Sequence, residues 1–133
     1  MTAIERYFFT PIYYPGSPLS VVKWWESRRP LFNACVGGAG LLSVGAIVVS
    51  SVLPPHPLPI LVPWLGIVAY GVLANLCYSL GAPADMLLRR MLGPRAAAAG
   101  PVLFRYGFVF SLGLTLLPVP LSFLGWVIRL FVR

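Results

Sequence analysis

Residues 23–33 read KWWESRRPLFN, and residues 34–53 continue as ACVGGAGLLSVGAIVVSSVL. The second stretch carries no charged residue and reaches the roughly 20 apolar residues that a helix needs to cross a bilayer. The first stretch is typical of the entrance to such a span, because Trp favours the membrane–water interface and Lys and Arg collect on the cytoplasmic side. Pro30 fits the first turn of a helix, where its missing N–H costs nothing. The pattern predicts a membrane span that begins at about residue 30.

The composition of the whole chain supports this prediction. The 133 residues are 59% hydrophobic and 10% charged, whereas a soluble domain is about 25% charged. A soluble domain of this length leaves too much of its surface in water to hide so many apolar side chains. We therefore expect an all-α integral membrane protein, a compact bundle over residues 30–133 preceded by an interfacial N-terminal arm over residues 1–29.

The arm divides into two parts. Residues 1–17 hold five aromatic residues and show no helical or strand period, which predicts an extended segment at the level of the lipid head groups. Ser17 and Pro18 predict the N-cap and first turn of a short amphipathic helix that reaches about Arg29. An irregular interfacial loop over the same residues is the alternative.

Apolar runs predict spans at about residues 30–53 and 59–80, separated by a Pro-rich loop, with a basic connector and a short surface helix over residues 82–99. The last 33 residues allow two arrangements. A hairpin broken at Pro118 and Pro120 would give four membrane segments, the last two short or tilted. A single Pro-kinked helix would give three spans.

The distribution of cations favours the hairpin. Eight of the ten Lys and Arg residues precede the first span or follow the second. A hairpin would bring Arg129 and Arg133 to the same side and satisfy the positive-inside rule, with the N-terminus in the cytoplasm. The same rule accounts for the net charge of +7, so we expect anionic lipids as partners and no nucleic acid.

Small and polar residues recur four apart in each predicted span, a spacing that lets helix backbones approach closely. Asn33 and Asn75 lie at similar depth, where a mutual or backbone hydrogen bond would join two helices. The predicted helix-packing or partner contacts are Asn33, Gly38, Gly71, Asn75, Ser79, Gly107, Ser111 and Thr115. The predicted interfacial anchors are Trp24, Trp25, Arg28, Arg29, Trp64, Arg89 and Arg90.

Chemistry-bearing groups are sparse. No Asp or Glu occurs from residue 27 to 84 or after Asp85, which argues against an ion-coupled transporter. No His or carboxylate accompanies a Ser or Cys as a catalytic base would, so we expect no enzyme and no catalytic residues. The only histidine, His56, lies in the Pro-rich loop. We expect no metal site and no cofactor of the chain's own, with lipids or pigments of a host complex as the remaining candidates.

Three motifs carry a family resemblance. They are WWExxR at residues 24–29, NxxYxxG at residues 75–81 and RxGxxFS at residues 105–111. The pattern resembles a family of small multi-span bacterial membrane proteins with no assigned function. The resemblance covers about residues 20–117 and implies a location in the bacterial inner membrane.

Two functional hypotheses follow. The first is a non-catalytic accessory or structural subunit that stabilises a larger bacterial membrane complex, respiratory or photosynthetic, through contacts with its larger subunits. The alternative is a small homo-oligomeric transporter or channel without ion coupling, in which the stripes 71/75/79 and 107/111/115 would line a path.

Overall fold

The computed structural model describes residues 2–10, 17–55, 57–59 and 64–132. His56 and Arg133 lie outside these ranges. The described residues form helices in the order α1 (Ala3–Phe9), α2 (Pro18–Glu26), α3 (Arg29–Val52), α4 (Trp64–Ser79), α5 (Gly81–Leu92), the 3₁₀ turn η1 (Gly93–Ala96), α6 (Ala99–Leu116) and α7 (Pro118–Phe131).

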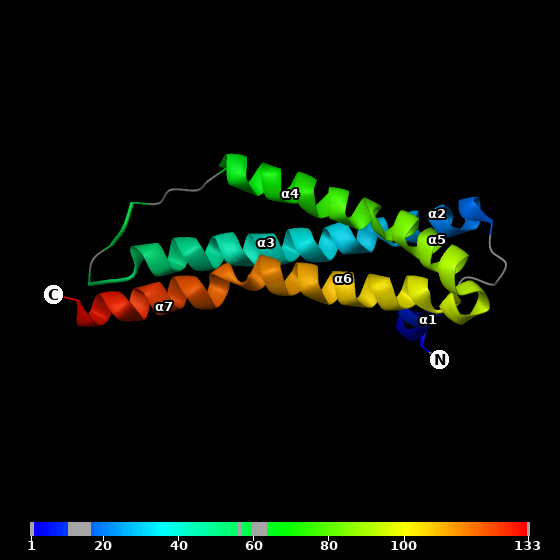
Figure 1. The fold of residues 1–133 in the computed structure, drawn as a ribbon. Coiled ribbons are helices and arrows are strands. Elements are labelled where there is room, and N and C mark those ends of the chain that lie inside the picture. Colours follow the sequence, from blue (N-terminus) through cyan, green and yellow to red (C-terminus); the bar gives the residue numbers. More distant parts are fainter. Residues whose placement is uncertain (1, 11–16, 56, 60–63, 133) are drawn as a thin grey trace.

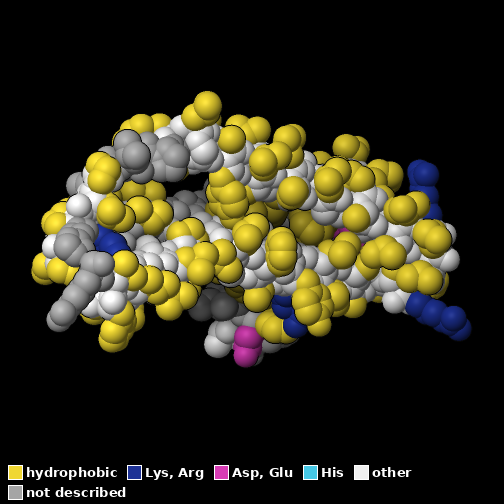
Figure 2. Space-filling view, turned by 60° about the vertical axis from the view of Figure 1, so that its left-hand side comes forward, with side chains coloured by type: hydrophobic (Ala, Val, Ile, Leu, Met, Phe, Trp, Pro, Cys, Tyr) yellow, Lys and Arg dark blue, Asp and Glu magenta, His cyan; other side chains and the backbone are white. Residues whose placement is uncertain are grey.

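Among the described residues, three helical stretches are long and apolar enough to cross a membrane. They run over Pro18–Val52, Trp64–Ala96 and Ala99–Phe131. The prediction of a helical chain with membrane-length apolar segments is therefore confirmed. In Figure 2 hydrophobic side chains cover the visible face along most of its length, as the surface of a protein immersed in lipid would require.

The helix starts follow the capping signals in the sequence. The hydroxyl of Ser17 accepts a hydrogen bond from the backbone N–H of Ser20 at 3.2 Å, and Pro18 opens α2. The predicted short helix is thus present. The prediction of an extended segment before it is wrong for residues 3–9, because Thr2 and Glu5 form a capping box that starts α1.

The predicted hairpin at Pro118 and Pro120 does not form. Leu117 keeps helical angles, with φ −54° and ψ −36°, and Pro118 occupies the first turn of α7, where a proline needs no hydrogen-bond partner. The helix axis therefore continues in the same direction, and α7 extends α6 along the side of α3 (Figure 1).

Two hydrogen bonds join the C-terminal half of α7 to the C-terminal end of α3 and the residues just after it. The indole Nε1 of Trp126 donates to the carbonyl of Pro54 at 2.9 Å. The guanidinium of Arg129 donates to the carbonyl of Ser50. Arg129 consequently lies at the end of the bundle opposite to α1, α2 and α5, away from the other described cations (Figure 1).

The bundle is uneven. Helices α6 and α7 lie along α3, and the hydroxyl of Ser43 donates to the carbonyl of Thr115 at 2.6 Å between α3 and α6. Helix α4 contacts the others near its C-terminal end and diverges from α3 toward its N-terminus (Figure 1). The principal hydrophobic cluster lies where α2, α4 and α6 meet the start of α3.

Candidate functional site

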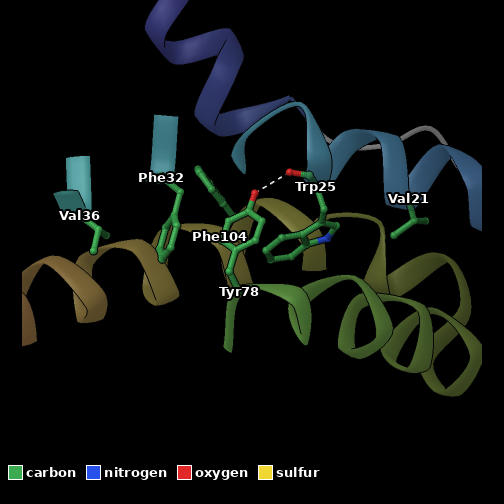
Figure 3. Close-up of a cluster of buried hydrophobic side chains, with 6 residues drawn as sticks. All are labelled: Val21, Trp25, Phe32, Val36, Tyr78 and Phe104. Atoms are coloured by element: carbon green, nitrogen blue, oxygen red, sulfur yellow. Dashed lines mark hydrogen bonds between the residues drawn. The ribbon is translucent and has the colours of Figure 1, made fainter. Parts of the chain in front are cut away.

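Four aromatic side chains, each from a different helix, meet in this cluster. Trp25 of α2, Phe32 of α3, Tyr78 of α4 and Phe104 of α6 are buried and surround one another (Figure 3). The Tyr78 hydroxyl donates to the carbonyl of Trp25 at 2.5 Å, and the two rings meet edge to face with centroids 5.5 Å apart. We call these four residues the aromatic junction. It fixes the relative positions of all three long helical stretches.

Gly81 is required for the closeness of this packing. A Cβ built on Gly81 would overlap the six-membered ring of the Trp25 indole. Since Gly81 opens α5 three residues after Tyr78, the ring of Trp25 is held between the end of α4 and the start of α5. The NxxYxxG motif thus supplies both a hydrogen-bond donor and a flat surface for the WWExxR motif.

A buried ion pair lies beside the junction. Asp85 is fully buried, and its Oδ1 accepts a hydrogen bond from Nε of Arg89 at 2.8 Å. The indole Nε1 of Trp25 is 3.4 Å from Oδ2 of Asp85, and a Cβ on Gly100 would lie 2.7 Å from the same oxygen. A buried charge is tolerated when it is paired and hydrogen-bonded, so Asp85 ties α5 to α2 and to the start of α6.

Sequence reasoning did not select Asp85 as a site residue. Two signals pointed to it: Asp85 is the only acidic residue after Glu26, and Arg89 follows four positions later on the same helical face. The prediction of a basic connector with a short surface helix over residues 82–99 gives Asp85 no buried position.

Arg28 holds the N-terminal helix. Its Nε and Nη2 donate to the carbonyl of Tyr7 at 2.9 and 2.7 Å, near the C-terminal end of α1. The guanidinium also lies 3.6 Å from the centroid of the Trp24 ring, and the Trp24 indole donates to the carbonyl of Thr10 at 3.2 Å. A cation at a helix C-terminus is favourable because the helix dipole is negative there.

Tyr7 strengthens the attachment of α1. Its hydroxyl donates to the carbonyl of Ser27 at 3.0 Å. Partial burial raises the pKa of the Tyr7 phenol above its ordinary value of about 10. The phenol therefore keeps its proton, and this hydrogen bond persists throughout the neutral pH range.

Arg29 connects α3 to α4. It forms an ion pair with Glu26 at 2.7 Å and donates to the Ser79 hydroxyl at 3.0 Å and to Oδ1 of Asn75 at 3.5 Å. Asn75 also donates to the carbonyl of Gly71 at 3.1 Å, which is a backbone bond within α4. Asn33 lies on the exposed side of α3, so the predicted Asn33–Asn75 pair does not form, and Arg29 is the partner of Asn75 in its place.

The other small and polar residues that were predicted to pack between helices do so only in part. The Tyr70 hydroxyl of α4 lies 2.5 Å from Oγ1 of Thr115 and 3.4 Å from the carbonyl of Ser111, both on α6. By contrast, a Cβ on Gly38 or Gly107 would meet no atom within 4 Å. The polar members of the stripes thus join helices within the chain, while these two glycines face open space.

The seven predicted anchors differ in exposure. Trp64 and Arg90 are exposed, and Trp24 and Arg29 are half-buried. The other three, Trp25, Arg28 and Arg89, are buried, with exposed fractions of 5%, 7% and 8%. These three pack against other parts of the chain, and their depth relative to a membrane surface stays a prediction.

An open cleft adjoins the junction between α4 and α6. Its volume is about 460 Å³, and its walls are almost entirely apolar. The residues that line it include Tyr70, Ala74 and Cys77 of α4, Gly81 of α5, and Gly107 and Ser111 of α6. Within α4, only Tyr78 is buried, so this helix has an open inner side facing the cleft and an exposed outer side.

Chemistry other than packing has little support among the described residues. In those ranges no three His, Cys, Asp or Glu side chains are grouped so that they could hold a metal ion. The expectations about enzymatic activity and cofactors remain predictions.

Two of the three motifs that carry the family resemblance therefore interlock. WWExxR and NxxYxxG meet through Trp25, Tyr78, Gly81, Arg29 and Asn75, whereas RxGxxFS contributes the α6 wall of the cleft. The resemblance itself stays a prediction. No protein-family model, no curated protein and no solved structure matches this chain.

Proposed function

We propose that the chain is a non-catalytic accessory subunit that stabilises a larger complex of the bacterial inner membrane by presenting α4 to another subunit. The single observation that carries the proposal is that α4 diverges from α3 toward its N-terminus, whereas α6 and α7 lie along α3 (Figure 1), and only Tyr78 of the sixteen residues of α4 is buried. In the hydrocarbon of a bilayer there is no hydrophobic driving force for apolar helices to associate. Membrane helices therefore associate through close packing and hydrogen bonds. A helix with so few internal contacts suits a partner outside the chain.

The outer side of α4 offers a continuous face for such a partner. Leu65, Val68, Val72 and Leu76 follow helical spacing and are 85%, 62%, 55% and 58% exposed. None of the four lines the cleft. We call them the outer stripe. Branched side chains of this kind form ridges into which a neighbouring helix can pack.

Several contacts support a packing role over a transport path. Asn75 and Ser79 are engaged by Arg29, and Thr115 is engaged by Tyr70. A path for a polar solute would need such groups to be free, while a scaffold needs them joined. In the proposed topology the cation-rich end, with α1, faces the cytoplasm and contacts anionic lipids, and Arg129 at the other end is accommodated by the Ser50 carbonyl.

The test is gentle purification of the tagged chain from its native membrane, followed by mass spectrometry of what accompanies it. We expect larger subunits at a fixed ratio to the chain. Val68→Trp and Val72→Trp on the outer stripe should release them, whereas the matched change Leu42→Trp on α3, at a side chain 68% exposed, should not. Recovery of the chain only as a homo-oligomer would contradict the proposal and favour the transporter or channel.

A further inference from the structure

The cleft between α4 and α6 is bridged at one end and adjoins the aromatic junction toward the other. At the bridged end the hydroxyl of Tyr70 reaches across to Thr115 at 2.5 Å. Toward the other end the lining passes Gly81, which packs on Trp25 of the junction, and reaches Ala84 of α5. Tyr70 and Ala84 lie fourteen positions apart, so the cleft is about 21 Å long at 1.5 Å per residue.

The shape of the cleft suits an occupant more slender than a helix. Its volume of about 460 Å³ is that of a small-molecule site, for which ~300–1,000 Å³ is usual. A helix with its side chains is about 10 Å across, and the Tyr70–Thr115 contact crosses one end of the cleft. A partner helix, or a helix of a second copy, can therefore rest on the rim but cannot lie along the cleft past this contact.

The polarity of the cleft excludes most polar ligands. The hydroxyls of Tyr70 and Tyr78 and the indole N–H of Trp25 line the cleft but already have partners inside the chain. Ser111 and Cys77 add only a hydroxyl and a thiol to the wall. Binding a polar molecule would leave most of its donors and acceptors unpaired, which is costly in an apolar site.

A bilayer around the chain would contain slender apolar groups, the acyl chains of its lipids. The cleft lies within helical stretches long and apolar enough to span a bilayer, where lipid chains are abundant. We infer that the cleft binds one acyl chain of a membrane phospholipid, with the lipid head group at the end of the molecule that carries the exposed cations Lys23, Arg90 and Arg95. The site is on the inner side of α4 and is therefore independent of the outer stripe and of the proposed function.

The test uses a substitution that places a bulky side chain inside the cleft. Gly107→Phe places a ring in the cleft, since a Cβ there meets nothing within 4 Å. Gly113→Phe is the matched control on the same helix, because Gly113 is equally open but does not line the cleft. Each protein is reconstituted in vesicles of phosphatidylethanolamine and phosphatidylglycerol, extracted in mild detergent and examined by native mass spectrometry.

We expect the wild-type chain and Gly113→Phe to retain one phospholipid per chain and Gly107→Phe to retain at least tenfold less. Equal retention by the two variants, or no retained lipid in the wild type, overturns the inference. Ala74→Phe fills the cleft from the α4 wall. If Gly107→Phe fails to fold, the phospholipid retained by Ala74→Phe is measured in its place, with the same tenfold loss expected. A phospholipid with a diazirine in its acyl chain should label Leu73, Cys77 or Leu103 in this detergent-purified state; labels confined to the outer stripe would also overturn it.

Discussion

The aromatic junction and the N-terminal part of α4 differ sharply in how their helices are packed. At the junction, buried rings, a 2.5 Å hydrogen bond and a paired carboxylate hold α2, α4, α5 and α6 together. Along residues 64–69 every side chain is exposed. The comparison teaches that both regions are apolar enough for a bilayer, but only specific fits and polar bonds determine which helices touch.

The largest effect is expected at the buried ion pair. Asp85→Leu leaves Arg89 buried without a counter-charge and should lower the free energy of unfolding by about 3–5 kcal/mol. Reversible unfolding in detergent micelles measures the loss. The double variant Asp85→Leu with Arg89→Met should recover most of it, because two apolar side chains can replace a buried pair. If the single variant is as stable as the wild type, the pair is solvated and the junction is looser than described.

The next effect concerns the attachment of α1. Arg28→Gln replaces the charge-assisted bonding to the Tyr7 carbonyl, with a net loss of about 1.5–3 kcal/mol in all. The rate at which a protease removes residues 2–10 should then rise roughly tenfold to a hundredfold. Arg90→Gln, at an exposed position, is the control and should leave the rate unchanged; equal rates for both variants would show that Arg28 does not hold the helix.

Two glycines sharpen the comparison between the regions. Gly81→Ala forces a methyl group into the Trp25 ring, and such overpacking should cost about 1–3 kcal/mol. Gly71→Ala in α4 meets no atom within 4 Å and should be neutral or stabilising by up to about 1 kcal/mol, through helix propensity alone. Thermal unfolding of both variants checks the contrast, and a reversed order would place the tight packing in the wrong region.

A single hydroxyl should have a smaller effect. Tyr78→Phe removes the donor to the Trp25 carbonyl and should destabilise the chain by about 1 kcal/mol. Tyr106→Phe, whose side chain is 76% exposed, is the control and should change stability very little. The difference between the two unfolding midpoints is the quantity to measure, and equal midpoints would remove this bond from the account.

The smallest effect is expected on the outer stripe of the isolated chain. Val68→Ala and Val72→Ala should change the free energy of unfolding by no more than about 0.5 kcal/mol, as exposed substitutions usually do. Unfolding of the purified chain tests this expectation. A loss of several kcal/mol would mean that the stripe packs against the chain's own helices.

The helical class and the starts of α2 and α3 could be predicted from the sequence, because membrane length and capping are local properties. Ser17, Pro18 and Pro30 set helix starts through their own backbone chemistry. The direction taken after Leu117 could not be predicted in this way. The positive-inside rule favoured a return, but two prolines fit equally well in the first turn of a continuing helix.

The candidate site was predictable only in part, since Phe104 and Asp85 were not among the expected site residues. The sequence drew attention to Trp25, Arg28, Arg29 and Asn75, and all four take part in contacts near the junction. Their partners are set by tertiary packing across up to sixty residues of chain, as between Trp25 and Asp85. Interfacial preference therefore accounts for the composition of residues 23–33 but does not reveal that Trp25, Arg28 and Phe32 are buried.

The central claim is that α4 is completed by another subunit, and photo-crosslinking in the native membrane tests it most directly. A benzoyl-phenylalanine replaces Val72 on the outer stripe or, as the control, Leu42 on α3, and the membranes are irradiated before extraction. The account predicts one crosslinked protein of defined mass from position 72 and only lipid adducts from position 42. Lipid adducts alone from both positions, or a crosslink solely to a second copy of this chain, would contradict it.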